Sequence, residues 1–301
     1  MHQYWGFGLR IASEFEIPEL LAEREGSAEV TVKYGTVPEF HGQLQRFDGC
    51  NIGIGEKDYF LEIPATCRYY VDDELHITVE PFEGIDGRSV RIYLLATVMA
   101  FVLHRRGHVP LHASAIRRGN ELILLSGDSG SGKSTALAGL SDKGYQVFSD
   151  DVCVLSHTAQ NLVWASASYP MIKLWEDAVE KLDSSAYTGK DFPVKKGIEK
   201  YGYFFHDSFS KERLPVKRII ILRKSESGGR SSVKELQGLA KFAALEQQVY
   251  RKSLVTTPQQ QTIPFNAIAM LANQCQVFEI TRPLNQAATD TLQIIIENID
   301  A

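Results

Sequence analysis

The chain has 301 residues, which is enough for one large domain or two of ordinary size. Hydrophobic residues make up 44% of it and charged residues 23%, proportions typical of a soluble globular protein. The formal net charge of −5 at pH 7 excludes a general electrostatic attraction to nucleic acid or to an anionic membrane.

Cysteine usage and apolar runs favour a cytoplasmic location. The four cysteines form no C-x-x-C pair, which argues against a zinc site and against a disulfide framework. The N-terminal stretch lacks a basic segment followed by an apolar core, so no secretory signal is expected. The longest apolar run, residues 92–103, is too short to span a bilayer. We therefore expect a cytoplasmic protein with no membrane partner and no nucleic-acid partner.

Residues 1–88 carry short strand signals. The segment 29–34 alternates between apolar and polar residues and places Val30, Val32 and Tyr34 on one face. Further strand candidates, separated by turn residues, lie at 59–63, 68–71 and 75–80. We predict an antiparallel, β-rich N-terminal lobe over residues 1–88, with the aromatic residues of the opening YWGFG stretch packed in its core.

A helix and a hairpin follow this lobe. One apolar helix with a basic end is predicted over residues 88–106, since cations favour a helix C-terminus. A strand is predicted over 109–116, and a turn leads from it into a second strand at 122–126. His112 lies in the first strand of this hairpin. The residues alone leave open whether His112 is a packed or a catalytic histidine.

A phosphate-binding motif of the form G-x-x-x-x-G-K-S follows the second strand. Its members are Gly127, Asp128, Ser129, Gly130, Ser131, Gly132, Lys133 and Ser134. A helix is predicted over residues 134–143, and this strand–turn–helix context lets backbone N–H groups and the helix dipole stabilise a phosphate. We predict that the motif and Thr135 bind ATP. Lys133 is expected to reach the outer phosphates as an exposed cation, and the Ser134 hydroxyl to bind Mg²⁺.

Two adjacent carboxylates stand at the carboxyl end of the next predicted strand, residues 146–148. They belong to Asp150 and Asp151. Ligands of open α/β sheets lie beyond the carboxyl ends of the strands, and phosphoryl transfer needs one group on the metal and one that orients the nucleophile. We predict Asp150 as a metal ligand beside Ser134. We favour Asp151 as the base, although the sequence does not exclude the reverse assignment.

The rest of the chain is predicted mostly as strands and helices. The strands are predicted at 152–155, 162–165, 170–175, 216–223 and 276–281, and the helices at 175–182, 236–250, 264–272 and 284–299. Residues 188–203 are instead predicted as a polar loop, in which Lys195, Lys196 and Lys200 are either solvated or meet phosphate or a substrate carboxylate. The sequence does not choose among three candidates for a cation that assists phosphoryl transfer, which are Arg282, Arg218 and Lys200.

From about residue 104 to the end, the chain resembles the catalytic domain of HPr kinase/phosphorylase. The matching segments are LHASAI, LLSGDSGSGKST and GYQVFSDDVCVL. The resemblance implies an α/β fold of the P-loop kinase type found in HPr kinase and phosphoenolpyruvate carboxykinase, with a mixed sheet flanked by helices over residues 89–301. It also implies ATP and Mg²⁺ as cofactors and a seryl hydroxyl as acceptor. The residues at the family's functional positions are His112, Lys133, Ser134, Asp150 and Asp151.

Two departures separate the chain from HPr kinases themselves. Thr135 stands where those kinases usually carry glutamate, and their downstream glycine-rich signature is missing. These departures argue against phosphorolysis and against HPr as substrate. The segments FGLRIASEFEIPEL, ERLPVKRIIIL and ITRPLNQAA look more like HPr-kinase-like proteins of peptide natural-product clusters. In that group, the resemblance implies phosphorylation of a serine near the C-terminus of a lasso-peptide precursor.

The function predicted from the sequence is ATP-dependent transfer of the γ-phosphoryl group to a serine hydroxyl of a peptide. Two alternatives remain. One is a non-catalytic or weakly hydrolytic ATP-binding regulatory module, and the other is a small-molecule kinase. A homo-oligomer is implied only by the family, because HPr kinases assemble as hexamers. Replacement of Lys133 by alanine is predicted to abolish phosphoryl transfer and to leave the fold largely intact.

Overall fold

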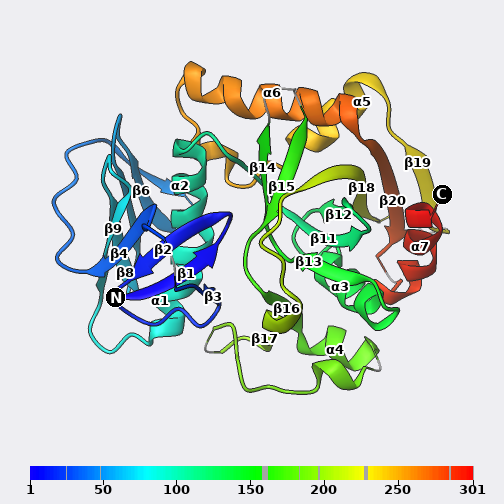
Figure 1. Cartoon of the computed structure of the whole chain (residues 1–301), viewed down its shortest axis with the longest axis horizontal. Coiled ribbons are helices and arrows are strands. Elements are labelled where there is room, and N and C mark those ends of the chain that lie inside the picture. Colours follow the sequence, from blue (N-terminus) through cyan, green and yellow to red (C-terminus); the bar gives the residue numbers. More distant parts are fainter. Residues whose placement is uncertain are drawn as a thin grey trace.

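In the described part of the chain, the strands form two nine-stranded sheets and one two-stranded sheet (Figure 1). The computed structural model describes the whole chain except residues 25, 48, 158–161, 183, 196, 227–229, 285 and 301. In Figure 1 the first sheet lies at the left, and the second sheet with most of the helices lies at the centre and right. None of the helices in the described residues is long and apolar enough to cross a membrane.

The first sheet is built from the N-terminal part of the chain, in the order β3-β1-β2-β4-β9-β8-β7-β6-β5. Its strands are β1 His2–Gly6, β2 Leu9–Ser13, β3 Leu21–Ala22, β4 Val30–Tyr34, β5 Leu44–Phe47, β6 Cys50–Ile54, β7 Tyr59–Ile63, β8 Cys67–Val71 and β9 His76–Pro81. The predicted antiparallel arrangement is wrong at β4, which pairs in parallel with both β2 and β9. The reason is that the connection after β2 returns the chain to the end of the sheet where β2 began.

The predicted faces of this sheet are largely confirmed. Val30 and Val32 are each 1% exposed, whereas Tyr34, at the end of β4, is 45% exposed. The aromatic residues of the opening stretch are buried, as predicted for core residues rather than a recognition surface. They are Tyr4, Trp5 and Phe7.

The helical segment after the first sheet packs between the two sheets. It consists of α1 Gly87–Tyr93, the π-helical turn η1 Leu94–Val98 and α2 Met99–Arg105, so the single α-helix predicted over 88–106 is interrupted. Asp86 caps its start by accepting hydrogen bonds from the backbone N–H groups of the first turn. Its apolar side chains share one core with the first sheet, where Phe101 stacks on Tyr59 with ring centroids 4.4 Å apart.

The second sheet places the phosphate motif at its centre. Its strands are β10 Val109–Leu111, β11 Ala113–Arg118, β12 Glu121–Gly127, β13 Gln146–Ser149, β14 Cys153–His157, β15 Val163–Ala167, β18 Leu214–Ser225, β19 Ser232–Glu235 and β20 Gln276–Pro283. β12 pairs antiparallel with β11, which confirms the predicted hairpin, and in parallel with β18. Leu124 faces one core and Leu125 the other, which explains why this central strand is an uninterrupted apolar run.

The strand predicted over residues 109–116 is two strands. β10 pairs with β14, whereas β11 pairs with β12 and β13, so the chain changes partners at His112. The backbone N–H of His112 donates to the carbonyl of Gln248 at 2.8 Å, outside both ladders. Because of this break, the direction of the His112 side chain is not set by the alternation of a regular strand, and the side chain lies at the edge of the candidate site.

Helices cover both faces of the second sheet (Figure 1). They are α3 Lys133–Asp142, α4 Glu176–Leu182, α5 Gly238–Glu246, α6 Pro258–Gln274 and α7 Leu292–Asp300, with 3₁₀ turns η2 Ser185–Tyr187, η3 His206–Ser208, η4 Lys252–Leu254 and η5 Thr289–Thr291. The α3 and α7 helices pack on one face, and α5 and α6 pack on the other. The helix predicted at 284–299 is wrong over its first part, because β20 continues to Pro283 and the α-helix begins only at Leu292.

The small third sheet corrects the prediction of a loop over residues 188–203. It pairs β16 Met171–Trp175 antiparallel with β17 Lys200–Phe204, so the end of the predicted loop is a strand. The pairing spans more than twenty residues of sequence, and the alternating signal of β17 is too short to identify it from local pattern. Lys196, one of the lysines singled out from the sequence, lies outside the described residues.

The partly buried side chain of His104 is expected to make the protein less stable in mild acid. His104 Nε2 donates to the carbonyl of Tyr250 at 3.0 Å, and burial lowers the pKa of His104 below its usual value of 6.5. The unfolded chain therefore binds a proton that the folded chain does not, and stability falls as pH drops through about 6.5. Denaturant unfolding at a series of pH values should show this decline, and it should be smaller in His104→Gln. The exposed His2→Gln change serves as control and should leave the decline unaltered.

Candidate active site

The glycine-rich motif forms a tight loop between β12 and α3, as the sequence predicts. Gly127, Gly130 and Gly132 have φ values of +133°, +76° and +103°, conformations that favour glycine. A Cβ atom on Gly127 would lie 2.2 Å from the carbonyl oxygen of Leu222, and one on Gly132 would lie 2.6 Å from Ala288 Cβ. The loop therefore needs glycine both for its backbone angles and for its close approach to β18 and to the segment after β20.

Gly127→Ala is expected to lower the free energy of unfolding by about 2 kcal/mol or more, because the backbone strain is joined by a clash with a neighbouring strand. Gly144→Ala provides a matched control, since Gly144 has φ +87° but nothing within 4 Å of the added Cβ. The control should cost only about 1 kcal/mol of conformational strain. Denaturant unfolding of both variants measures the difference, and equal losses would contradict the close-approach argument.

Lys133, at the start of α3, is buried rather than exposed. Its side chain is 6% exposed, and Nζ donates to the carbonyl oxygens of Gly127 at 2.8 Å and Asp128 at 3.1 Å. The expectation of an exposed loop cation is therefore wrong, because the loop curls around the ammonium group. Burial lowers the pKa of Lys133, and the nearby carboxylates of Asp151 and Asp150 oppose that shift.

Ser134 connects the loop directly to the acidic pair. Its Oγ donates to Asp150 Oδ1 at 2.9 Å. Asp150 is 1% exposed and accepts two further hydrogen bonds, from Ser114 Oγ at 2.7 Å and from the backbone N–H of Lys173 at 3.0 Å. The carboxylate of Asp150 is thus held behind Ser134 and away from the cavity. With its proton directed at Asp150, the Ser134 oxygen keeps its lone pairs for a cation.

Asp151 lines the cavity, whereas Asp150 does not. The φ of Asp151, +69°, is unusual for a residue other than glycine and is the kind of local strain that clusters at functional sites. Its Oδ2 accepts a hydrogen bond from Lys173 Nζ at 2.5 Å. Burial alone would raise the pKa of the Asp151 carboxyl, but Lys173 and His112 together hold it well below its usual range. Asp151 is therefore an ionised carboxylate facing the cavity.

His112 lies against the same carboxylate. Its Nδ1 donates to the backbone oxygen of Asp151 at 3.0 Å and is 3.6 Å from Asp151 Oδ1. Burial, with a further contribution from the Lys133 charge, lowers the pKa of His112, so the imidazole is neutral at pH 7. With a proton on Nδ1, the ring keeps Nε2 as a hydrogen-bond acceptor. The structure places His112 at the cavity rather than in the packed core.

Two side chains of this site have no motif that would identify them in the sequence. Lys173 pairs with Asp151 and also donates to the hydroxyl of Tyr169 at 3.1 Å. Gln248 Oε1 accepts from Ser126 Oγ at 2.9 Å and from the backbone N–H of Gly127 at 3.0 Å, so it fixes the first residue of the loop. A lysine inside the apolar MIKLW run is the only cue for Lys173, and nothing in the sequence marks Gln248.

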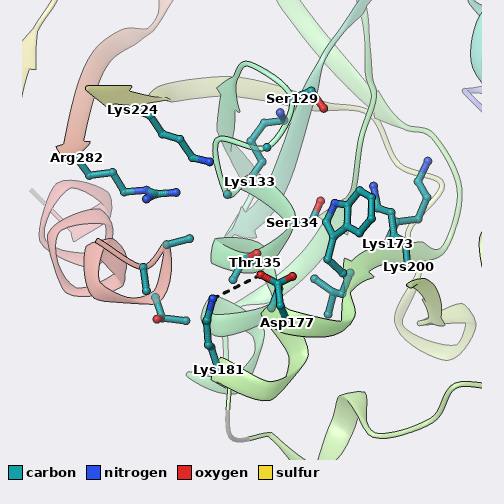
Figure 2. Close-up of a pocket in the computed structure, with 18 of the residues that line it drawn as sticks. Ser129, Lys133, Ser134, Thr135, Lys173, Asp177, Lys181, Lys200, Lys224 and Arg282 are labelled. Carbon is teal, nitrogen blue, oxygen red and sulfur yellow. Dashed lines mark hydrogen bonds and ion pairs between the residues drawn. The ribbon is translucent and has the colours of Figure 1, made fainter. Parts of the chain in front are cut away.

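The loop opens on a cavity of about 310 Å³ that is rich in positive charge (Figure 2). The motif residues Ser129, Gly130, Gly132, Lys133 and Ser134 line it, as does Thr135, whereas Gly127, Asp128 and Ser131 do not. Of the described residues that line the cavity, six are cationic and two are acidic, which suits a polyanion. The cations are Lys133, Lys173, Lys181, Lys200, Lys224 and Arg282, and the acids are Asp151 and Asp177.

The lining of this cavity excludes one of the three candidates for a cation that assists phosphoryl transfer. Arg282 and Lys200 line it. Arg218 does not, because its guanidinium is buried at the C-terminal end of α7, where it donates to the Ile299 carbonyl at 3.2 Å and to Gln276 Oε1 at 2.6 Å. Lys195, predicted as either solvated or in contact with phosphate or a substrate carboxylate, does not line the cavity, and its Nζ donates to the Tyr93 hydroxyl at 3.3 Å.

The donor set of the loop fits a nucleotide with Mg²⁺. Ser131 Oγ is buried in the loop and has no hydrogen-bond partner within the described part of the chain. No group of three His, Cys, Asp or Glu side chains in the described residues is arranged to hold a metal by itself. Mg²⁺ often binds proteins through one or two groups and takes its other ligands from phosphate and water. Ser134, backed by Asp150, meets that requirement.

The fold and the site define a mixed α/β protein with a glycine-rich loop beside an acidic pair. One similar solved structure is the Hpr(Ser) kinase/phosphatase from Coxiella burnetii, with 15% sequence identity and a TM-score of 0.31. The similarity covers 63% of this chain and 95% of that one. No protein-family model matches the sequence, and no curated protein matches it.

Proposed function

We propose that the protein is an ATP-dependent kinase that transfers the γ-phosphoryl group to a serine hydroxyl of a peptide. The observation that carries the proposal is the 2.9 Å hydrogen bond from Ser134 Oγ to Asp150 Oδ1. It joins the phosphate loop to the acidic pair, and Lys133 and Asp151 then face one cavity. Phosphoryl transfer needs this combination of anion binding, metal binding and a group that orients the nucleophile.

The phosphates would be held by the loop and its cations. Backbone N–H groups at the start of α3 and the Lys133 ammonium would bind the β- and γ-phosphates. Ser134, with Asp150 behind it, would hold Mg²⁺, which supplies neutralisation of the phosphate charge. Arg282 donates to the Ser131 carbonyl at 3.3 Å and is therefore close enough to the loop to stabilise charge on the phosphates.

Asp151 would orient the acceptor. The serine oxygen forms its bond to the γ-phosphorus while the bond from that phosphorus to the β–γ bridging oxygen breaks, so ADP leaves and the hydroxyl proton passes to the Asp151 carboxylate. Its depressed pKa makes Asp151 a weak base. In a loose phosphoryl-transfer transition state, little proton transfer from the attacking hydroxyl is needed early in the reaction. The main contribution of Asp151 is therefore to align the hydroxyl with the γ-phosphorus.

The acceptor class that we propose is the C-terminal region of a lasso-peptide precursor. It is supported by the sequence resemblance of three segments outside the loop, which are FGLRIASEFEIPEL, ERLPVKRIIIL and ITRPLNQAA. A short precursor gene beside the gene for this protein would add support.

Mass spectrometry of a candidate precursor peptide after incubation with the protein, ATP and Mg²⁺ tests the proposal. We expect the gain of one phosphoryl group on a serine, with ADP formed in equal amount. Tight ATP binding without transfer to any peptide would favour a regulatory module instead. Transfer to a small metabolite but to no peptide would favour a small-molecule kinase.

A further inference from the structure

The cavity carries cations at two ends, one on each side of the phosphate loop, and only one of these ends also holds the Asp151 carboxylate. Figure 2 shows Lys224 and Arg282 on one side of Lys133, and Lys173 and Lys200 on the other. The first pair lies against the loop, since Lys224 Nζ is 4.0 Å from the position of a Cβ on Gly130. The second pair lies at the end that contains Asp151, because Lys173 Nζ donates a hydrogen bond to that carboxylate.

An acceptor must approach from the Asp151 end. In-line transfer places the attacking oxygen and the leaving nucleotide on opposite sides of the γ-phosphorus. The group that orients the attacking hydroxyl is Asp151, so the nucleotide extends toward Arg282 and the acceptor lies near Lys173 and Lys200. The ammonium groups of Lys173 and Lys200 therefore lie close to the acceptor rather than to the nucleotide.

Lys200 is the cation at this end whose charge is not matched by a carboxylate. Lys173 is paired with Asp151, whereas within the described part of the chain no carboxylate oxygen lies within 4.0 Å of Lys200 Nζ. Burial, the Lys173 charge and a partial opposing effect of the Asp151 and Asp150 carboxylates leave the pKa of Lys200 lowered. A partly buried ammonium group of this kind gains stability when an anion binds beside it.

Trp175 provides a surface next to this ammonium. It faces Lys200 across the two-stranded sheet, where the two residues are direct cross-strand partners. Lys200 Nζ lies 5.5 Å from the centroid of the Trp175 ring, within the range of a cation–π interaction. The indole lines the cavity and yet is 46% exposed, which is unusual for the largest apolar side chain. An exposed aromatic face beside an unmatched cation suits the backbone of a peptide that carries a carboxylate.

We propose that Trp175 and Lys200 form an acceptor subsite that binds a carboxylate close to the serine that is phosphorylated. The subsite rests on the proposed function, because it takes the Asp151 end of the cavity as the acceptor side. The carboxylate is either the C-terminal group of the peptide or the side chain of an acidic residue beside the serine. The two sources have the same chemistry at Lys200 and are separated by experiment.

A labelled hexapeptide of glycine and alanine with a penultimate serine provides the probe. It is prepared as the free acid, as the C-terminal amide, and as amides with aspartate or asparagine after the serine. Fluorescence anisotropy in the presence of Mg²⁺ and the non-hydrolysable analogue β,γ-imido-ATP measures affinity without requiring transfer. We expect the wild-type protein to bind the free acid or the aspartate amide about tenfold more tightly than the matched neutral peptide. The preferred peptide identifies the source of the carboxylate.

Variants of the subsite assign that preference to residues. Lys200→Met should bind acid and neutral peptides alike, and Lys200→Arg should restore the preference. Lys181→Met is the matched control, because Lys181 lines the same cavity but is already paired with Asp177 at 3.5 Å; the preference should persist in it. Trp175→Ala should weaken binding of all four peptides about three- to tenfold, and Trp175→Phe should weaken it less.

The outcomes separate the subsite from the kinase proposal. Equal binding of acid and neutral peptides by the wild-type protein, or a preference that persists in Lys200→Met, overturns the subsite. Phosphoryl transfer to all four peptides at equal rates also overturns the subsite, while it supports the kinase. A carboxylate preference that Lys200→Met abolishes, without transfer from ATP, supports the subsite and rejects the kinase.

Discussion

Lys133→Met is expected to lower the rate constant of phosphoryl transfer by roughly 10²–10³-fold, the loss typical when one charged or hydrogen-bonding group is removed from a developing anion. Lys133 is 6% exposed, and its ammonium group lies inside the loop, where its hydrogen-bond partners among the described residues are the carbonyl oxygens of Gly127 and Asp128. Phosphate oxygens are better partners for that charge than carbonyls are. Initial rates with saturating ATP and Mg²⁺ measure the effect.

The burial of Lys133 decides which substitution makes a clean test. Alanine would remove a long buried side chain and would leave two loop carbonyls without their donor, so a loss of activity would be mixed with a loss of structure. Methionine keeps most of the volume and loses only the charge and the two hydrogen bonds. Thermal unfolding checks that the variant is folded, and Lys181→Met controls for a general loss of positive charge in the cavity. Transfer within threefold of the wild-type rate would refute the assignment of Lys133.

The parts of the site that were predicted correctly are those set by local sequence. The glycine positions, the strand before them and the helix after them form one contiguous segment, and their conformation follows from backbone sterics alone. The position of Asp150 and Asp151 after β13 is also local, since it depends on one apolar run and its end. A hairpin with a short turn completed this set, because β11 and β12 are neighbours in the chain.

The parts that were not predicted depend on contacts between distant segments. Gln248 reaches the loop from 121 residues away, and the pairing of Trp175 with Lys200 converts a predicted loop into a strand. The break at His112 arises because the strands on its two sides pair with different neighbours. Hydrophobic periodicity reports which face of an element is buried, but it carries no information on which other element buries it.

The different roles of Asp150 and Asp151 could not be predicted from the sequence either, because two identical neighbouring residues differ only in their surroundings. The carboxylate of Asp150 accepts three hydrogen bonds from described residues, and Asp150 is 1% exposed, so this carboxylate has little capacity to act on a substrate. Asp151, which has a φ of +69°, lines the cavity, whereas Asp150 does not. In the kinase that we propose, Asp151 is therefore the group placed to contact the acceptor, and Asp150 supports Ser134.

Asp151→Asn is expected to lower the rate constant of phosphoryl transfer by roughly 10²–10³-fold while ATP binding persists. Asparagine keeps the shape of the side chain and tolerates positive φ, so the backbone at this position should be retained. The amide neither accepts the hydroxyl proton nor carries the charge that Lys173 now balances. ATP affinity measured by calorimetry, beside the transfer rate, separates the loss of chemistry from a loss of nucleotide.

Lys173, whose charge Asp151 balances, offers a way to distinguish an effect of Asp151 on phosphoryl transfer from its effect on stability. Asp151→Asn leaves the Lys173 ammonium, 15% exposed, without its carboxylate, and this should cost about 1–3 kcal/mol of stability. Adding Lys173→Met removes the unmatched charge, so the double variant should regain stability as measured by denaturant unfolding. If Asp151 acts on the acceptor, the double variant stays inactive although it is stable. If the carboxylate serves only to neutralise Lys173, activity returns together with stability, and another group must orient the hydroxyl.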